Sequence, residues 1–526
     1  MKVKFKLLVF IILVCITRVG YSQPWYFNEI YNPNNTWASG MSIIGTSDGY
    51  FGCAISSDSI SEYYYNTCAF LLNHQGEIRS WRNFGQDGFD FYPGFYGSLI
   101  RTKDSCFALF GSQHNLYSDL SNGLFYKFNE VGDTIFTKTF YSETYDVLIG
   151  RACTNSSDGG YCLLCEVSNV SSNSDLIMIR TDSNANEILR YQYWTSDHET
   201  GISIIQSFDS GYVFGSWTRI PGQNETADPI VYKTDSLGNF EWSHNLGGPY
   251  KDDVAMVCNT QDSCIMVLTA YADSMRTPEH AYSKINLVKI DLEGNIVWNK
   301  KYGPSKPVNY ISNLIQIPNG NFVLCGYSML DEYMYLPAAG WIMEVNSEGD
   351  SLWYRDYYYY PENPDDSHNY LYDISLTSDH GFVATGQAYN LFGPNEINKM
   401  WVLKVDSVGC EIPNCWVGVE EEEETWGRGE EGKRGRLEIW PNPASGVLSV
   451  KCLGLSSGNS YSLAIYDIFG REVHADFISS ILTEGGRERG WQSWTIDVSA
   501  LPPGIYLAVV KDGQVVLASA KFMVVR

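Results

Sequence analysis

The sequence predicts an all-β protein: a seven-bladed β-propeller of four-stranded blades, followed by a separate small β-domain. Aromatic residues make up 14 % of the 526 residues, including 37 Tyr, a composition typical of strands. A pattern of four strand-like runs joined by tight turns recurs seven times from residue 40 onward. Beyond residue 416 the composition changes before strand-like runs resume. These observations indicate a closed repeat architecture with an appended module.

An acid or amide in the turn before the second strand anchors each repeat. The anchors lie 51 to 60 positions apart, which fits a propeller blade and exceeds the length of a solenoid rung. A short apolar run before each anchor predicts the inner strand, for example residues 201–205. The seven anchors are Asp48, Asp104, Asp158, Asp209, Asp262, Asn319 and Asp379.

A second turn follows the third strand of each unit, where apolar and polar residues alternate with a period of two. It starts with Asp or Asn and pivots three residues later on Gly, except at Ala185. The Asp or Asn side chain bonds the backbone ahead of it, and Gly adopts positive φ without strain, so each turn predicts a hairpin. A bulky residue such as Trp242 marks the fourth strand. The turns start at Asn73, Asn129, Asp182, Asp235, Asp291, Asn346 and Asp406, with pivots Gly76, Gly132, Gly238, Gly294, Gly349 and Gly409.

The two ends of the repeat array complement each other. The last unit lacks a fourth strand, because CEIPNCW follows Gly409. Residues 25–31 have no partner and match fourth-strand sequences. We predict that this N-terminal segment completes the seventh blade and closes the ring without a free sheet edge. The propeller then spans residues 23–416.

Residues 1–22 have the features of a secretory signal peptide. A basic start precedes the apolar residues 7–16, and Gly20 and Ser22 occupy the −3 and −1 positions of a cleavage site. We therefore expect cleavage between Ser22 and Gln23. No later segment approaches about 20 uninterrupted apolar residues, so no transmembrane segment is expected in the mature chain.

Charge and motifs exclude several classes of function. The net charge of −25 argues against a nucleic-acid partner, because binding to a phosphate backbone needs a basic surface. The eight His form no HxxH or HExxH motif, and no GxSxG, Walker or dinucleotide-binding motif occurs. We therefore assign no metal, no cofactor and no catalytic residue from the sequence. A triad whose members are far apart in the chain stays open.

Export places the mature chain in a disulfide-permissive setting, and two pairs of Cys have local spacing. Cys410 and Cys415 lie five positions apart, and Cys258 and Cys264 flank a short turn as the facing ends of a hairpin do. Both pairs are candidate disulfides.

Two further pairs are weaker candidates for chemistry. Cys53 and Cys68 form a less favoured disulfide candidate. Cys162 and Cys165 form a CxxC, but they lie in a strand-like run, where residues three apart point to opposite faces. We interpret them as buried thiols or structural disulfide cysteines and not as a redox pair.

The end of the chain consists of a linker and a module. Residues 417–436 combine the acidic run at 420–424 with Gly and basic residues and lack apolar periodicity. This predicts a solvated linker, which we favour over a calcium site. Residues 437–526 contain short strand-like runs separated by turns at PNPASG, DIFGRE and LPPG, which indicate a β-domain.

Three elements of this module, in this order, resemble the type A C-terminal sorting domain of the type IX secretion system, found on exported proteins of the Bacteroidetes. They are the PNP turn, the segment IYDIFGREV and the segment LPPGIY. The resemblance implies a β-sandwich that engages the outer-membrane secretion machinery and is usually removed as its cargo is released or attached to the cell surface. The residues that carry it are Pro441, Asn442, Pro443, Tyr466, Asp467, Gly470, Arg471, Leu501, Gly504 and Tyr506.

Six sites carry Asp followed by Ser or Thr and an apolar residue, among them residues 235–237 and 350–352. The pattern resembles the O-glycosylation signal of exported Bacteroidetes proteins. Simple turn composition explains it equally well.

Candidate binding residues lie where the repeat is broken. Loops at residues 56–66, 220–228 and 272–283 are longer than their equivalents, and recognition usually lies in loops on a rigid scaffold. The most irregular segment is 354–370, where aromatic rings beside carboxylates suit contact with a glycan or a partner protein. Alternatively, residues 357–360 partly continue the fourth strand. The candidates in this segment are Tyr357, Tyr358, Tyr359, Tyr360, Asp365, Asp366 and His368.

We therefore expect a propeller that is secreted or anchored at the outer cell surface and that binds a protein or glycan through loops on one face, without catalysis. The alternatives are a propeller-type glycan hydrolase or lyase and a structural surface-layer protein. Catalytic side chains converging from different blades on the central channel would favour the enzyme.

Overall fold

A computed structural model describes residues 25–412 and 436–524, apart from 34–35, 58–63, 170–173, 194–197, 220–226, 253, 278–279, 307–308, 330–336, 361–366, 391–397, 441–446, 454–460, 468–471, 479–491, 500, 502–503 and 513–514. The Ser22–Gln23 junction and the linker up to residue 435 lie outside the described residues. Contacts divide the chain into two compact units, Met1–Glu411 and Ile412–Arg526. No helix among the described residues is long and apolar enough to cross a membrane.

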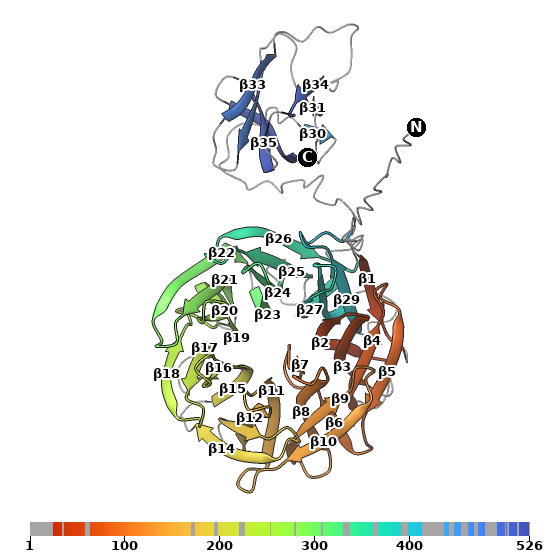
Figure 1. The fold of residues 1–526 in the computed structure, drawn as a ribbon, viewed down its shortest axis with the longest axis vertical. Coiled ribbons are helices and arrows are strands. Elements are labelled where there is room, and N and C mark those ends of the chain that lie inside the picture. The colour runs from red at the N-terminus through yellow and green to blue at the C-terminus, as the bar shows by residue number, and fades with distance from the viewer. Residues whose placement is uncertain are drawn as a thin grey trace, which may run out of the picture. The chain divides into compact units, whose positions relative to one another are not determined.

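The strands of the first unit pair into four-stranded antiparallel blades arranged around a ring (Figure 1). Three blades are separate four-stranded sheets, and one sheet of eight strands and one of nine strands contain two blades each, which gives seven. The blades within these larger sheets are linked by single parallel bridges, Ala338–His368 and Val147–Ser121. The predicted all-β propeller is confirmed.

Blades 1 to 4 follow the chain, each from its inner to its outer strand. Blade 1 comprises β2 (Ala38–Thr46), β3 (Gly49–Ser57), β4 (Tyr65–Leu72) and β5 (Ile78–Phe84). Blade 2 has a divided inner strand, β6 (Phe89–Tyr92) and β7 (Leu99–Arg101), followed by β8 (Phe107–Asn115), β9 (Ser121–Phe128) and β10 (Thr134–Phe140). Blade 3 comprises β11 (Val147–Asn155), β12 (Tyr161–Ser168), β13 (Asp175–Thr181) and β14 (Glu187–Tyr193). Blade 4 comprises β15 (His198–Gln206), β16 (Tyr212–Arg219), β17 (Ala227–Thr234) and β18 (Phe240–Asn245).

Blades 5 to 7 complete the ring. Blade 5 comprises β19 (Met256–Asn259), β20 (Ile265–Thr277), β21 (His280–Ile290) and β22 (Ile296–Lys306). Blade 6 comprises β23 (Asn309–Gln316), β24 (Phe322–Met329), β25 (Ala338–Val345) and β26 (Ser351–Tyr357). Blade 7 comprises β27 (Ser367–Leu376), β28 (Phe382–Asn390), β29 (Lys399–Val405) and, from the other end of the unit, β1 (Phe27–Tyr31).

Strand β1 closes the ring as predicted. It pairs antiparallel with β29, from Phe27 opposite Lys404 to Tyr31 opposite Met400. The Tyr31 hydroxyl also donates a buried hydrogen bond to the carbonyl of Gly76 in blade 1, at 2.5 Å. The N-terminal strand therefore joins the last blade to the first.

The predicted hairpin chemistry is confirmed at the turns between third and fourth strands. Asp235 Oδ1 accepts hydrogen bonds from the backbone N–H groups of Leu237 at 2.8 Å and Asn239 at 2.9 Å. Gly238 has a φ of 88°, and the exceptional Ala185 adopts the same left-handed conformation with a φ of 57°. The bond to the residue four positions ahead recurs in the other six turns.

The pivot Gly residues also make room for the neighbouring blade. A Cβ atom on Gly294 would lie 3.0 Å from the Trp242 ring of blade 4, and one on Gly409 would lie 2.7 Å from the Trp353 ring of blade 6. Bulky fourth-strand side chains thus pack on the turn of the next blade, so one residue provides both the turn and the blade contact.

The second unit is a β-sandwich. One sheet contains β30 (Arg436–Trp440), β31 (Val447–Leu453) and β34 (Gln492–Asp497), and the other contains β33 (Glu472–Ile478), β32 (Tyr461–Asp467), β35 (Gly504–Asp512) and β36 (Val515–Val524). Side chains of both sheets share one core, with Val450 and Ile496 from the first, and Leu463 and Phe522 from the second.

Candidate functional site

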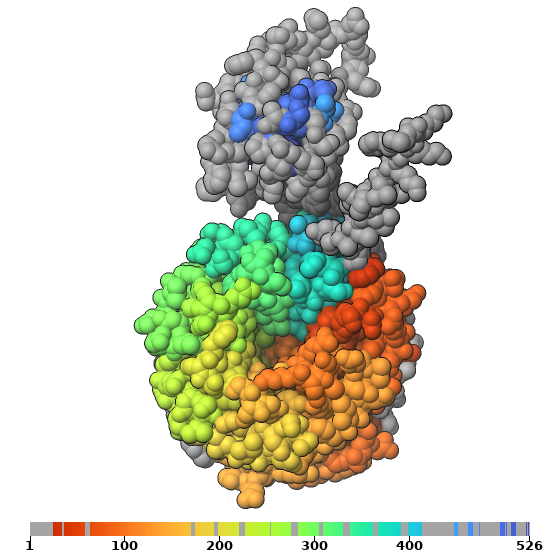
Figure 2. Space-filling view, in the orientation of Figure 1, coloured from red at the N-terminus to blue at the C-terminus, as the bar shows by residue number. Residues whose placement is uncertain are grey.

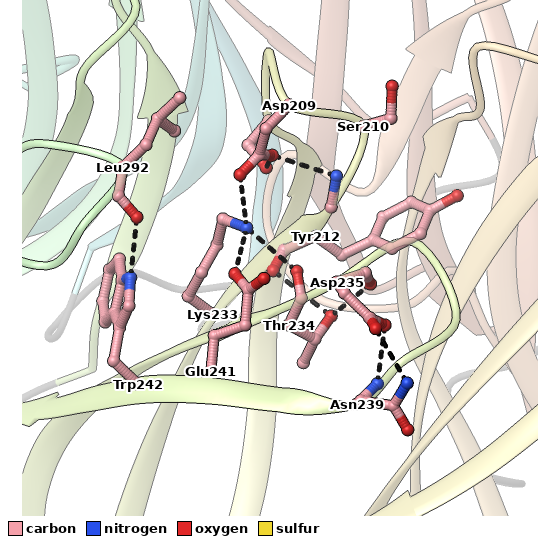
Figure 3. A network of polar contacts seen from close by, with 12 residues as sticks. Asp209, Ser210, Tyr212, Lys233, Thr234, Asp235, Asn239, Glu241, Trp242 and Leu292 are labelled. Atoms are coloured by element: carbon pink, nitrogen blue, oxygen red, sulfur yellow. Dashed lines mark hydrogen bonds and ion pairs between the residues drawn. The ribbon is translucent and has the colours of Figure 1, made fainter.

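The most conspicuous charged residues of the repeat form structural ion pairs, as Figure 3 shows for blade 4. The buried Lys233 Nζ lies 2.8 Å from Asp209 Oδ2 and 2.6 Å from Glu241 Oε2. In blade 6 the acid is on the third strand instead, where Glu344 accepts from Asn321 Nδ2 at 2.6 Å. Recurrence assigns these residues to the scaffold and not to a ligand site. Equivalent pairs are Lys127–Asp104, Arg180–Asp158, Lys289–Asp262 and Lys404–Asp379.

The irregular connections belong to one face of the ring. In an antiparallel blade, the connection between the second and third strands and the connection to the next blade start at the same end. The long loops at 56–66, 220–228 and 272–283 join second to third strands, and the irregular segment 354–370 joins blade 6 to blade 7. The flanking strands therefore end on one face, which we call the loop face. The short Asp-containing turns lie on the opposite face.

Residues 93–98 of blade 2, between β6 and β7, extend toward the centre of the ring (Figure 1), and we call them the plug. Strand β6 pairs up to Ser112 of β8, and β7 resumes at Leu109. Six residues on the inner strand therefore oppose two on its partner. Five other blades have a single bulge at the same place, so the plug is an enlarged bulge. Figure 1 shows the chain next to β7 projecting into the ring centre, and Figure 2 shows the hollow there.

The plug contacts blades all around the ring. Phe95 packs against an apolar cluster that includes Ile202, Met256 and Ile311 from the inner strands of blades 4, 5 and 6. Its backbone N–H donates to the carbonyl of Arg151 in blade 3 at 2.8 Å.

Asp373 is a buried carboxylate beside the plug, and all its hydrogen-bonding capacity is used. Its Oδ2 accepts from Ser42 Oγ and Ile43 N of blade 1, both at 2.7 Å, and its Oδ1 accepts from Asn313 of blade 6 and from Ile374 N. Burial raises the pKa of Asp373 to about 6, although these hydrogen bonds counteract the rise. The carboxylate ties three blades together and has no lone pair directed at a ligand.

The candidate residues of segment 354–370 divide into scaffold and surface. Tyr357 ends β26, is buried, and donates to the carbonyl of Gly409 at 2.8 Å. Tyr193 and Tyr302 make the same bond to the pivot carbonyl of the next blade. Tyr357 is therefore a blade-linking residue, in agreement with the alternative that it continues the fourth strand.

The remaining candidates of this segment lie nearer the loop face. Tyr358, Tyr359 and Tyr360 are half-buried, and the last two pack against the blade 6–7 core. His368 is buried in β27, and its Nδ1 contacts the hydroxyls of Tyr370, at 2.5 Å, and Tyr389. Asp365 and Asp366 lie outside the described residues.

A cluster of tyrosines that was not predicted from the sequence lies beside His368, which contacts two of them, Tyr370 and Tyr389. The rings of Tyr327 and Tyr370 lie 4.2 Å apart, and Tyr96 of the plug stacks on Tyr372 at 4.1 Å with an interplanar angle of 4°. Two signals in the sequence point to it: Tyr in inner strands where other repeats have smaller residues, and the extra residues PGFYGS before Leu99. We define Tyr96, Tyr310, Tyr327, Tyr370, Tyr372 and Tyr389 as the tyrosine platform.

The structure corrects one predicted disulfide. Cys258 and Cys264 are free, because the hairpin register places Met266 opposite Cys258 and puts Cys264 outside the strand pair. Cys410 is disulfide-bonded, but Cys415 lies outside the described residues, so that pairing stays a prediction.

The two members of each remaining Cys pair lie on opposite sheet faces and are not bridged to each other. Cys53 lies opposite Ala69, one position out of register with Cys68, so no bridge forms. Cys162 and Cys165 pack into different core clusters, which confirms that they are buried thiols. Burial raises the pKa of Cys162 and Cys165 well above the usual range, so neither resembles a reactive thiolate.

Some sorting-motif residues have positions in the second unit. Tyr466 lies in β32, and Tyr506 of β35 is buried against Phe522, with ring centroids 5.6 Å apart. Leu501 packs against the sandwich core. Asp467 and Gly504 end β32 and begin β35. The other predicted motif residues, Pro441, Asn442, Pro443, Gly470 and Arg471, lie outside the described residues.

Four of the Asp-Ser/Thr-apolar sites lie in exposed turns opposite the loop face. Their hydroxyl residues are Thr134, Ser236, Ser351 and Ser407, all exposed. The apolar residues that follow are exposed too, for example Leu237 at 56 %. An exposed turn is compatible with both interpretations of the pattern, as simple turn composition and as an O-glycosylation signal.

Among solved structures, similarity extends to proteins of several activities. They include the β-propeller domain of the Trilobed protease from Pyrococcus furiosus (8 % identity, 70 % of this chain and 95 % of that chain, TM-score 0.39). They also include an ulvan lyase of polysaccharide lyase family PL25 (9 % identity, 73 % of this chain and 96 % of that chain, TM-score 0.42). A third is an α-L-arabinanase from Penicillium chrysogenum (11 % identity, 58 % of this chain and 92 % of that chain, TM-score 0.37). We therefore base the assignment of a propeller on the strand pairing alone.

The second unit matches a known family. A search of the curated proteins finds no match for the chain. Residues 438–525, however, match the secretion system C-terminal sorting domain. This agrees with the order of the three sequence elements and with the β-sandwich. The chain therefore ends in a type IX C-terminal sorting domain, which implies secretion by that system.

Proposed function

We propose that the propeller is a non-enzymatic recognition module, carried to the cell exterior by its sorting domain, that binds a protein or glycan through the loop face. The observation that carries this proposal is the segregation of irregular connections. Every long departure from the repeat noted in the sequence joins strands that end on the loop face, while the opposite face keeps the repeated turns. Variable loops on a rigid scaffold are the usual arrangement of a binding protein.

The central channel offers little support for catalysis. Phe95 of the plug packs against an apolar cluster of inner-strand residues, and each carboxylate oxygen of Asp373 accepts from two donors. A general acid or base needs a lone pair or proton within reach of a substrate. No group of three or more His, Cys, Asp or Glu that could hold a metal is found within the described part of the chain.

The test separates binding from turnover. The purified mature chain is applied to arrays of oligosaccharides and of surface proteins, and each bound glycan is then incubated with the protein and analysed for shortened or unsaturated products. Binding without product formation is the expected result. Product formation that is lost on substitution of a channel residue supports the hydrolase or lyase, and absence of any ligand opposes the recognition module.

A further inference from the structure

We propose that the tyrosine platform on the loop face is a stacking site for a neutral oligosaccharide. This inference rests on the proposed binding function and names the site and the chemical class of ligand. Four of its six residues, Tyr96, Tyr310, Tyr327 and Tyr389, are half-buried, so part of each residue is accessible to solvent. Tyr370 and Tyr372 beneath them are 9 % and 6 % exposed and support the others.

The platform departs from the repeat, whereas the scaffold recurs. Tyr310 and Tyr370 each lie one residue before the first position of the inner-strand bulge, in blades 6 and 7. The equivalent residues in blades 1, 3 and 4 are Ser39, Ile149 and Thr200. Packing of the blade does not require Tyr at this place, because three other blades pack without it.

The position fits access from the loop face. Tyr310 and Tyr370 lie near the starts of the inner strands β23 and β27, and Tyr327 and Tyr389 lie near the ends of the second strands β24 and β28. These strand ends are the ones from which the irregular connections leave. Tyr96 adds a ring from blade 2, because the plug carries it to Tyr372.

Ring geometry favours a sugar over a cation or a prolyl segment. Tyr310 and Tyr327 are stacked at 4.6 Å with an interplanar angle of 18°, and the contact at 4.2 Å continues the array to Tyr370. Rings in mutual contact leave neither a cage for an ammonium group nor grooves for proline rings. The accessible parts of the four half-buried residues offer rigid aromatic surface, which suits the apolar face of a pyranose.

The charge of the protein favours a neutral ligand, and hydrogen bonds hold two rings of the platform in place. The net charge of −25 opposes the approach of an acidic polysaccharide. The hydroxyls of Tyr370 and Tyr389 converge on His368 Nδ1, which fixes the orientation of both rings. A ring held in place loses little entropy when it stacks on a ligand.

The test uses the mature full-length chain and four variants. Tyr327→Ala and Tyr389→Ala remove half-buried rings of the platform, and Tyr327→Phe keeps the ring without its hydroxyl. Tyr141→Ala removes a tyrosine that is 61 % exposed on the same face but outside the platform. The probes are an array of neutral and acidic oligosaccharides and a library of proline-rich peptides. Near-ultraviolet circular dichroism and thermal unfolding check that each variant is folded.

We expect the chain to bind neutral oligosaccharides, with affinity about tenfold lower in each alanine variant of the platform. Tyr327→Phe and Tyr141→Ala should bind as the unchanged protein does. Loss of binding in Tyr141→Ala equal to that in the platform variants, or binding confined to acidic glycans or prolyl peptides, overturns the neutral-sugar assignment. If glycans or proteins bind but the platform variants behave normally, this inference fails while the proposed recognition function stands. If no probe or surface protein binds at all, both fail.

Discussion

The ion pair of blade 7 differs from its equivalents in burial, and this difference predicts unequal costs for the same substitution. Lys404 and Asp379 have side chains with 0 % exposure at a separation of 3.0 Å, whereas Asp104 of the Lys127 pair is 57 % exposed. The reason is the N-terminal segment, because the Trp25 backbone N–H donates to Asp379 Oδ2 at 3.0 Å and covers it.

We expect Asp379→Asn to destabilise the propeller by about 3–5 kcal/mol, because it leaves the buried Lys404 charge without its partner. Asp104→Asn should cost about 1 kcal/mol or less, since water screens that pair. Denaturant unfolding of the mature chain at neutral pH, followed by tryptophan fluorescence, measures both. Circular dichroism of the folded variants confirms that the comparison starts from the same fold.

The pH dependence provides a second readout. Burial alone would raise the pKa of Asp379, but the hydrogen bond from Thr377 and the charge of Lys404 outweigh it and lower the pKa. A depressed pKa means that the carboxylate stabilises the fold above the unfolded pKa of about 3.9, and that this contribution is lost as the pH falls through the folded value. The difference in unfolding free energy between the unchanged chain and Asp379→Asn should therefore become smaller at acidic pH. Equal costs for the two Asn variants, or a gap independent of pH, would refute the argument.

Three further predictions concern packing, titration and blade contacts. Gly294→Ala should lower the free energy of unfolding by about 1–3 kcal/mol more than Gly159→Ala does, as measured by denaturant unfolding. Both residues have positive φ, but only Gly294 lies under the Trp242 ring. Equal losses in the two variants would contradict the packing role. The pKa of Asp373 is raised to about 6, so the folded state binds a proton more tightly than the unfolded state does. The free energy of unfolding should therefore fall by up to about 3 kcal/mol between pH 4 and 7, and this fall should be absent in Asp373→Asn. Tyr357→Phe should cost about 1 kcal/mol in unfolding free energy through loss of the bond to Gly409 and leave ligand binding unchanged; a binding defect would return Tyr357 to the ligand site.

The blades were predictable from sequence because their information is local and repeated. An Asp or Asn, a Gly three residues later and an alternating strand define a hairpin without reference to the rest of the chain, and seven copies remove the ambiguity of any single one. Ala185 shows the strength of this signal, since it adopts the turn conformation of the Gly it replaces. Closure by the N-terminal strand was predictable for the same reason. The last repeat lacks a fourth strand, and the unpaired residues 25–31 match the sequence pattern of the fourth strands.

The features that were missed depend on contacts between distant blades. The sequence PGFYGS marks an insertion, but only the structure shows that Phe95 packs against the inner-strand cluster of blades 4 to 6 and that Tyr96 stacks on Tyr372. The error at Cys258 and Cys264 has a different origin. The two residues are close in sequence, but Cys258 pairs with Met266, which lies two positions beyond Cys264, and only the register of the hairpin determines which residues face each other.

Ring closure and the tyrosine platform are physically coupled. The platform combines side chains of blades 6 and 7 with Tyr96, which the plug carries across from blade 2. That combination requires blade 7 to dock beside blade 1. The hydrogen bonds from Ser42 and Ile43 to Asp373 contribute to this docking, and β1 adds its pairing with β29 and the Tyr31 bond to Gly76. The N-terminal strand is far from the platform in sequence, yet it stabilises the junction across which Tyr96 and Tyr372 meet. We therefore expect loss of β1 pairing to weaken the contact between Tyr96 and Tyr372 as well as the closure of the ring.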